Sequence, residues 1–478
     1  MSFCAVSVES KFRLLGGIYI MKYQMTGNSK MVVGALLAVC LVFGMVQIGL
    51  AARHDFNGET VTFFTVVDHD IPPMAEYFAE GPNLVWLQEV EEMFNVKIEF
   101  NSTRRNAFIP DVVAGMIAGE PPGDIFWTRL GFTKMLAAQG MLHPLDGIID
   151  DGYYQRIPSV YRNKDFYELV GTPYAFSSND NPQRDGVLFN NPQGVVWNKQ
   201  IFEELDLPNL YELQESGDWT YEALIDIASQ AQRDTTGDGE IDLWGVGGMS
   251  RGIHWHQLAA TMVSNDATWV RIDEDGRATV NVTDPAFLDA LQLWQDLKMI
   301  HNATGPVGRG TFTGGNMAMM VSDMTGLMLT RDNEAVQDWG WVFYPKGPNA
   351  EDYVAVTHMF YVGSLALGAE NPEALVELAS ALWRSTEEYM NVPMEDFVER
   401  GLDLLARDGF IADRESYETF RRMYNNMDAL PFFRDFFINQ DGVAEAFRGI
   451  RDGEVFPAPA MAELQPALQA ALDEYLGQ

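Results

Sequence analysis

Segments typical of strands and of helices alternate along the first third of the chain, and this alternation limits the fold more than any other feature. Residues 61–67, 96–100 and 124–127 are short runs of β-branched and aromatic residues, as in buried strands. Residues 84–94 and 107–122 lie between them and repeat apolar side chains at helical spacing. Strands separated by helices at this spacing predict βαβ units and a parallel sheet, and therefore an α/β protein.

The rest of the chain stays mixed and ends in helices. Residues 174–194 are rich in Asn, Asp, Pro and Gly, which predicts a loop or a hairpin. Further strands are predicted at residues 317–322, 339–345 and 359–368. The C-terminal part is mostly amphipathic helix, and we expect Pro466 to divide the last helix.

The N-terminus has the pattern of an export signal. Lys22 and Lys30 precede an apolar run at 31–51 that ends in small residues, as in a signal peptide cleaved after Ala51. The run is also long enough to span a bilayer, so a retained anchor is an alternative. Cleavage would remove both cysteines, and the exported chain would depend on its core without disulfides. We expect an exported protein, periplasmic or extracellular and associated with the cell surface.

The chain is strongly acidic, with a formal net charge of -36. Such a charge argues against nucleic acid and against an anionic membrane surface as partners. Only six lysines follow residue 51. Because an acidic surface poor in lysine is relieved of self-repulsion at high salt, we expect a source from a saline or alkaline habitat.

Five segments follow one another in a characteristic order: residues 116–150, 194–245, 312–323, 339–349 and 371–383. Their order and combined pattern resemble the extracellular solute-binding proteins of ABC-type sugar importers, over roughly residues 60–475. The resemblance implies a two-lobed periplasmic-binding-protein-like fold of type II. Each lobe would be a mixed, mainly parallel sheet flanked by helices, followed by a helical C-terminal region.

The resemblance also implies a domain organisation and a function. The expected parts are an N-terminal extension and signal peptide (1–51), the first part of lobe 1 (52–178), most of lobe 2 (179–355), and a crossover strand with C-terminal helices (356–478). A monomeric receptor of this kind would bind a sugar or oligosaccharide between its lobes, close like a hinge and deliver the ligand to the transmembrane subunits of an ABC permease. Binding of a non-sugar solute is an alternative.

Several residues are candidates for the ligand site because open α/β sheets bind ligands at the carboxyl ends of their strands. Trp127 and Thr128 end one predicted strand, and Trp197 and Asn198 end another, although the family usually has a strand interior there. Tryptophan faces suit the C–H surfaces of sugars, and polar side chains suit their hydroxyls. For any one tryptophan, packing in the core is the alternative.

Other candidates come from places where related proteins offer cleft residues. His254, Trp255 and His256 precede a predicted helix; a zinc site is an alternative, but no third ligand is obvious nearby. Asp323 ends a predicted strand, where it could accept two sugar hydroxyls or cap a helix. His358 and Tyr361 lie where such proteins cross between lobes.

An acidic, glycine-rich stretch at residues 233–245 has part of the pattern of a calcium loop. Its candidate ligands are Asp234, Thr236, Asp238, Glu240 (through its carbonyl) and Asp242, with Gly239 at the turn. Gly245 stands where the bidentate acid of a complete loop belongs. We therefore expect a weak structural Ca²⁺ site; the alternative is a solvated turn rich in Asx and Gly.

Two enzyme hypotheses are less favoured. Residues 248–252 fit the G-x-S-x-G pattern of a hydrolase nucleophile, but the glycine-rich stretch before them is a poor match for the buried strand that this motif needs. A glycoside hydrolase needs two carboxylates across a sugar, and so acidic a chain offers many candidates for such a pair. A secreted carbohydrate-active enzyme is therefore the main alternative to a non-catalytic receptor.

Overall fold

The chain divides into two compact units, Met1–Ala51 and Ala52–Gln478. The computed structural model describes residues 54–67, 73–178, 192–248, 255–273, 277–305, 308–323, 335–357, 361–425, 427–429, 437 and 440–476. The predicted signal peptide and both cysteines lie outside these residues. No helix among the described residues is long and apolar enough to cross a membrane.

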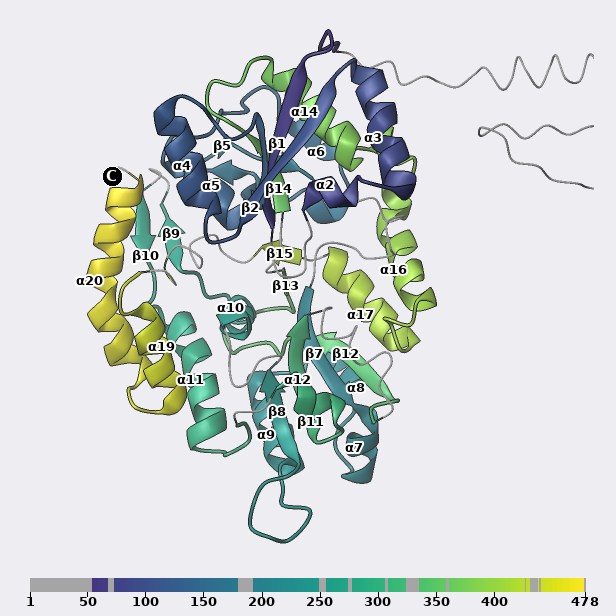
Figure 1. Ribbon diagram of the computed structural model, residues 1–478. Coiled ribbons are helices and arrows are strands. Elements are labelled where there is room, and N and C mark those ends of the chain that lie inside the picture. The colour runs from purple at the N-terminus through teal and green to yellow at the C-terminus, as the bar shows by residue number, and fades with distance from the viewer. Residues whose placement is uncertain are drawn as a thin grey trace, which may run out of the picture. The chain divides into compact units, whose positions relative to one another are not determined.

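The first sheet has five strands in the order β2-β1-β3-β14-β6 (Figure 1). They are β1 (Thr60–Val67), β2 (Lys97–Arg104), β3 (Ile125–Arg129), β6 (Phe176–Ser177) and β14 (Tyr361–Leu365). Strands β2 and β3 pair with β1 in parallel, as the βαβ pattern predicts, whereas β14 pairs antiparallel with both β3 and β6. The late strand β14 therefore returns to a sheet built from the beginning of the chain.

Four longer helices flank the first sheet: α3 (Gly81–Phe94), α4 (Phe108–Ala118), α5 (Leu130–Ala138) and α14 (Pro372–Trp383). Helix α3 begins with a proline near its first position and ends at Asn95 in a left-handed conformation. Helix α4 ends at Gly119, whose φ is 76°. Phe63, Phe108 and Phe126, fully buried, belong to the core between this sheet and its helices.

The second sheet has six strands around β7 (Pro192–Asn198). The others are β8 (Trp244–Gly248), β11 (Met317–Asp323), β12 (Trp339–Phe343), β13 (Ala355–Thr357) and β15 (Met427–Ala429). Strand β7 pairs antiparallel with β11, β12 and β13, while β11 with β8 and β13 with β15 are parallel pairs. Both sheets are mixed, as predicted. Among the described strands, fewer neighbouring pairs are parallel than expected, because β7 and β14 run antiparallel to their neighbours.

The helices on the second sheet carry regular start signals. Helix α9 (Tyr221–Ala231) is capped by Thr220 and α11 (Pro285–Met299) by Asp284, each through a side-chain oxygen that accepts a backbone N–H. Trp219 and Trp341 are fully buried. The Trp341 ring stacks on Phe420 of α17 (Arg414–Asn425) with ring centroids 5.2 Å apart.

The C-terminal helices are α16 (Phe397–Arg407), α17, α19 (Val443–Asp452) and α20 (Pro457–Leu476). Helix α20 continues through Pro466, so the expectation that this proline divides the helix is wrong. The short elements are α2 (Met74–Tyr77), α6 (Asp151–Arg156), α7 (Lys199–Glu204), α8 (Leu210–Ser216), α10 (Trp255–Val263), α12 (Arg309–Thr313), α15 (Glu387–Met390), β4 (Glu168–Leu169), β5 (Thr172–Pro173), β9 (Val270–Ile272), β10 (Ala278–Val280) and the 3₁₀ turns η1 (Ser159–Tyr161), η2 (Lys164–Phe166) and η3 (Met394–Asp396).

Candidate functional site

The connections between the two sheets bring their strand ends together. Strand β13 ends in the second sheet at Thr357, and β14 begins in the first sheet at Tyr361. Four Cα steps of 3.8 Å cannot separate these two residues by more than about 15 Å. A second connection runs from β6 to β7. The facing edges are therefore the end of β3 with the start of β14 in one sheet, and the start of β7 with the end of β11 in the other.

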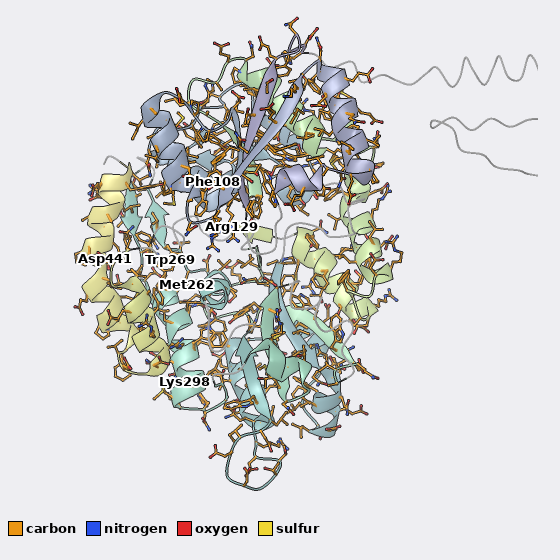
Figure 2. The ribbon with its side chains drawn as sticks, viewed as in Figure 1. Phe108, Arg129, Met262, Trp269, Lys298 and Asp441 are labelled. Atoms are coloured by element: carbon orange, nitrogen blue, oxygen red, sulfur yellow. The ribbon has the colours of Figure 1, made fainter. Side chains whose placement is uncertain are left out.

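The edge of the first sheet carries an aromatic pair and an arginine. Trp127 of β3 and Tyr361 of β14 stack with ring centroids 4.6 Å apart. Arg129, at the last position of β3, is 8% exposed, and its Nε donates to the Tyr361 hydroxyl at 3.2 Å. In the view of Figure 2, Arg129 lies at the lower end of the first sheet, between that sheet and α10. A buried guanidinium, a donor that cannot lose its proton, is thus fixed at the strand end.

Hydrogen bonds through Ser178 hold the pair Trp127 and Tyr361 in place. The Trp127 Nε1 donates to Ser178 Oγ at 2.8 Å, and Ser178 Oγ donates to the carbonyl of Tyr361 at 3.0 Å. Trp127 also packs against Trp383 of α14, with centroids 6.5 Å apart. Because Trp127 and Tyr361 are both buried, this pair supports the strand end and does not present an open ring face.

Thr128 lies between Trp127 and Arg129 in β3 and is fully buried. Its hydroxyl has no hydrogen-bond partner among the described residues. A buried polar group without a partner is costly. This hydroxyl is therefore a donor and acceptor on β3 that a hydrogen-bonding ligand could satisfy.

The edge of the second sheet carries a buried acid. Asp323, the last residue of β11, is 3% exposed. Its strand partner is Gln193 of β7, which also pairs with Val356 of β13. The Ser322 hydroxyl donates to the backbone carbonyl of Asp323 at 2.8 Å. Asp323 therefore lies at the edge of the second sheet that faces the strand end with Arg129, since the short β13–β14 connection keeps these two edges close.

Two predicted ligand residues lie elsewhere, and this corrects the prediction. Trp197 and Asn198 are at the far end of β7, because this strand runs antiparallel to β11. The Trp197 ring packs edge-on against Phe202 and Tyr211 in the core, with centroids 4.7 and 5.4 Å away. Asn198 caps α7 by accepting the backbone N–H groups of its first turn. Both therefore have structural roles at the opposite edge of the sheet.

The remaining candidates are only partly described. The backbones of Trp255 and His256 form the start of α10, and their side chains lie outside the described part of the structure. His254 and His358 also lie outside it, as does most of the 248–252 motif, whose first glycine ends β8. These predictions stay predictions.

The acidic stretch forms a hydrogen-bonded loop between α9 and β8. Arg233 and Leu243 close its base by two backbone hydrogen bonds. Asp234 accepts the backbone N–H groups of Gly239 at 2.7 Å and Gly237 at 2.5 Å, and these two bonds, in that order, are the main reason that its pKa lies below the usual value. Asp242 accepts the N–H of Thr235 at 2.8 Å.

The predicted calcium ligands share this loop, which lies at the beginning of β8 and therefore at the edge of the second sheet away from Asp323. They are Asp234, Thr236, Asp238, Glu240 and Asp242. Across the described residues, no group of three His, Cys, Asp or Glu side chains is arranged to hold a metal ion. The backbone N–H groups of the loop serve as the partners of its acids, so calcium stays a prediction.

Sequence reasoning did not single out Arg129 or Ser178. Arg129 directly follows Trp127-Thr128 at the same strand end, so the strand-end rule could have included it. Ser178 could not be found this way, because its position beside Trp127 depends on β14 pairing with both β3 and β6.

The comparisons with known proteins agree with this architecture. Residues 84–377, more than half of the chain, match the family model described as bacterial extracellular solute-binding protein. No curated protein matches the sequence.

Several solved structures share the fold. The cyclic alpha-maltosyl-1,6-maltose binding protein from Arthrobacter globiformis is 15% identical with a TM-score of 0.60, covering 87% of this chain and 99% of its own. An ABC substrate-binding protein from Listeria monocytogenes in complex with cycloalternan is 13% identical (TM-score 0.56, coverage 88% and 99%). A solute-binding protein from Agrobacterium radiobacter K84 in complex with ribitol is 14% identical (TM-score 0.57, coverage 87% and 99%). The family match over most of both sheets leads to one conclusion: this chain belongs to the bacterial extracellular solute-binding proteins.

Proposed function

We propose that the protein is the receptor of an ABC importer and binds a sugar or oligosaccharide between the facing strand ends of its two sheets. The observation that carries this proposal is the pair of buried charged residues at these ends, Arg129 in one sheet and Asp323 in the other. A guanidinium donates and a carboxylate accepts, so together they suit a neutral ligand with many hydroxyl groups.

The related structures support a hydroxylated ligand. The relatives from Arthrobacter and Listeria are a cyclic maltosyl-maltose binding protein and a complex with cycloalternan, and the relative from Agrobacterium is a complex with ribitol. An oligosaccharide is our main expectation, and a small polyol is the second candidate because of the ribitol complex.

The family description supports an extracellular location, and the predicted export signal agrees with it. In this proposal the monomeric receptor delivers its ligand to the transmembrane subunits of the permease. Hinge closure brings the two strand edges together around the ligand.

Calorimetry on the chain from Ala52 onward tests the proposal with maltotetraose, cycloalternan, ribitol and D-mannitol, alongside analysis of the recovered sugars. We expect saturable binding of at least one of these ligands and its recovery unchanged. Shortened sugars in the recovered material would instead show a glycoside hydrolase.

Substitution of the two charged residues locates the site. Because hydrogen bonds to charged groups contribute about 1.5–3 kcal/mol, Arg129→Met and Asp323→Asn should each weaken binding about tenfold or more. Arg162→Met is the matched control, since Arg162 donates to the carbonyls of Ile157 and Gln155 away from these strand ends. Equal affinity in wild type and in both site variants, with all proteins folded, would remove the site from these strand ends.

A further inference from the structure

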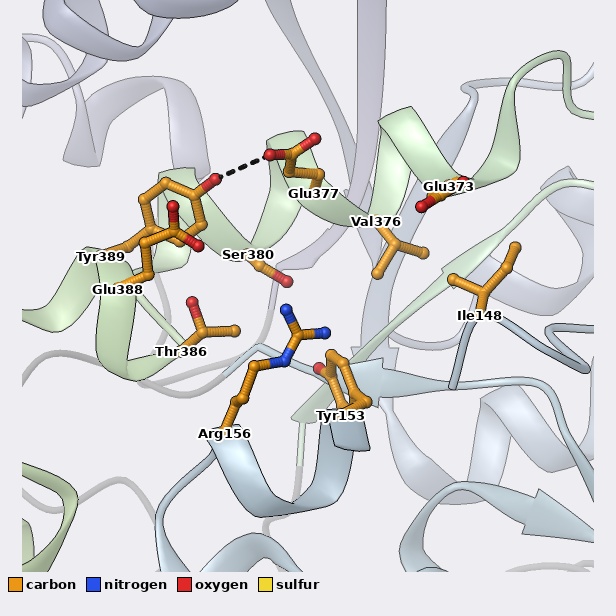
Figure 3. A pocket seen from close by; sticks show the side chains of 10 residues that line it. All are labelled: Ile148, Tyr153, Arg156, Glu373, Val376, Glu377, Ser380, Thr386, Glu388 and Tyr389. Atoms are coloured by element: carbon orange, nitrogen blue, oxygen red, sulfur yellow. Dashed lines mark hydrogen bonds between the residues drawn. The ribbon is translucent and has the colours of Figure 1, made fainter. Parts of the chain in front are cut away.

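A separate pocket lies between α6, α14 and α15, on helices that flank the first sheet (Figure 3). It is open to solvent on one side. Arg156, at the end of α6, extends toward Ser380 of α14 across this space. Neither Arg129 nor Asp323 lines this pocket, which makes it distinct from the strand-end site.

Two buried hydroxyl groups line the pocket. Ser380 is 3% exposed and Thr386 is 5% exposed. The Thr386 hydroxyl has no hydrogen-bond partner in the described structure; the Ser380 hydroxyl has none within normal hydrogen-bond distance and interacts only weakly with the Tyr153 hydroxyl. Thr386 stands directly before α15 without capping it. An unpaired buried hydroxyl is costly. A molecule that enters the pocket and forms hydrogen bonds with these two groups would therefore be stabilised there.

Charges of both signs surround these hydroxyls. The Arg156 guanidinium lies over the Tyr153 ring, 6.0 Å from its centroid, and forms no ion pair with any described residue. Glu377 accepts from the Tyr389 hydroxyl at 3.2 Å and is bonded to His54 Nδ1 at 2.6 Å. Glu373 and Glu388 are exposed and line the same pocket.

The presence of one arginine and three glutamates around the pocket favours a neutral ligand. An anion near Arg156 would be repelled by the three glutamates, and a cation near the glutamates would be repelled by Arg156. A neutral molecule with several hydroxyl groups can accept from Arg156 and donate to carboxylates, while Ser380 and Thr386 do either. Ile148 and Val376 add an apolar wall for its carbon atoms.

We infer that this pocket is a second ligand site, which binds one small neutral polyhydroxyl molecule of the size of a polyol or a monosaccharide. The inference does not depend on the proposed receptor function, because none of the residues that carry it belongs to the strand-end site. A hydrogen bond connects the pocket to the first sheet, because the Ser177 backbone N–H of β6 donates to the Tyr153 hydroxyl at 2.9 Å.

Methyl NMR on the chain from Ala52 onward tests the site, with the Ile148 δ1 methyl as reporter and Ile148→Val to assign its signal. The probes are glycerol and ribitol, and the charged comparisons are inorganic phosphate and methylammonium. We expect glycerol and ribitol to shift the Ile148 signal in a saturable way, and the two charged probes to leave it unchanged.

The variants separate this site from others. Arg156→Met and Ser380→Ala should each weaken the ribitol affinity read at Ile148 at least threefold. Ser229→Ala is the control, because the Ser229 hydroxyl only donates to the Ile225 carbonyl within α9. Arg129→Met should leave the Ile148 response unchanged even where it abolishes binding at the strand ends.

Three outcomes would overturn the inference. They are an unchanged Ile148 signal at saturating polyol, a shift produced by phosphate or methylammonium instead, and a polyol shift that Arg129→Met removes. The last result would show that Ile148 only reports binding at the strand ends.

Discussion

At the scale of single residues, Asp452 joins two helices that are distant in sequence. Its carboxylate accepts from Arg451 at 2.7 Å, and also from Lys298 of α11 at 2.7 Å. These partners, Arg451 foremost, lower the pKa of Asp452 from 3.8 to about 2. Because the pKa is lower in the folded state, the resulting stability is complete above about pH 4 and is lost as the pH falls toward 2.

Asp452→Asn should therefore lower the free energy of unfolding at pH 7 by about 1 kcal/mol, a modest value because the ion pairs are open to solvent. The difference from wild type should shrink as the pH falls below about 4. Urea denaturation at several pH values between 7 and 3 measures it. Asp226→Asn, exposed on α9, is the control. A difference that stays constant over this range would contradict the linkage.

Calcium binding by the loop at residues 233–245 can be decided by thermal melting. If the loop binds the ion weakly, millimolar CaCl₂ should raise the melting temperature over chelator by about 1–3 °C. Asp242→Asn should remove that difference, because it takes away one of the proposed oxygen ligands. Identical melting of wild type with CaCl₂ and with chelator would leave a loop held only by its own hydrogen bonds.

At the scale of elements, the packing of α9 on β8 explains why the loop lacks its last acid. A Cβ atom on Gly245 would lie 2.0 Å from the carbonyl oxygen of Ala228 in α9. No side chain fits there without moving the helix, whatever the loop would gain from a carboxylate. The position that completes a calcium loop is thus also the position where a strand must pass under a helix.

Gly245→Ala should destabilise the protein by about 1–3 kcal/mol through overpacking. Gly310→Ala in α12 is the matched control, because a Cβ there meets nothing within 4 Å and alanine favours a helix. Chemical denaturation of both variants measures the contrast. Equal stability of Gly245→Ala and wild type would mean that α9 can move away at little cost.

The uninterrupted helix α20 shows how neighbouring elements outweigh a local signal. Pro466 removes one backbone donor, which a helix tolerates when other contacts hold it. Gln465 and Gln469 on either side of it donate to the carbonyls of Val280 and Ala278 in β10. The backbone N–H of Val280 donates in return to Gln469 at 2.8 Å. These bonds to a strand nearly two hundred residues away were not visible in the sequence.

At the scale of the whole molecule, two sheets joined by the short β13–β14 crossing and by the longer connection from β6 to β7 suit hinge closure. With a ligand established by calorimetry, small-angle X-ray scattering should show a fall of a few per cent in a radius of gyration of about 22 Å. Arg129→Met at the same ligand concentration should show a smaller fall, because it weakens binding. An unchanged radius for wild type at saturation would show binding without closure.

The sequence by itself determined the α/β class, most strands and helices, and the family resemblance, since these depend on local periodicity, caps and order along the chain. It also pointed to Trp127, Thr128, Asp323 and Tyr361, which the structure places at or near the facing strand ends. Only the tertiary structure decided that Trp197 and Asn198 lie at the opposite edge, because strand direction depends on which strands pair. It likewise decided that Arg129 lies beside Tyr361 and that Gly245 can carry no acid, because both depend on contacts between segments far apart in the chain.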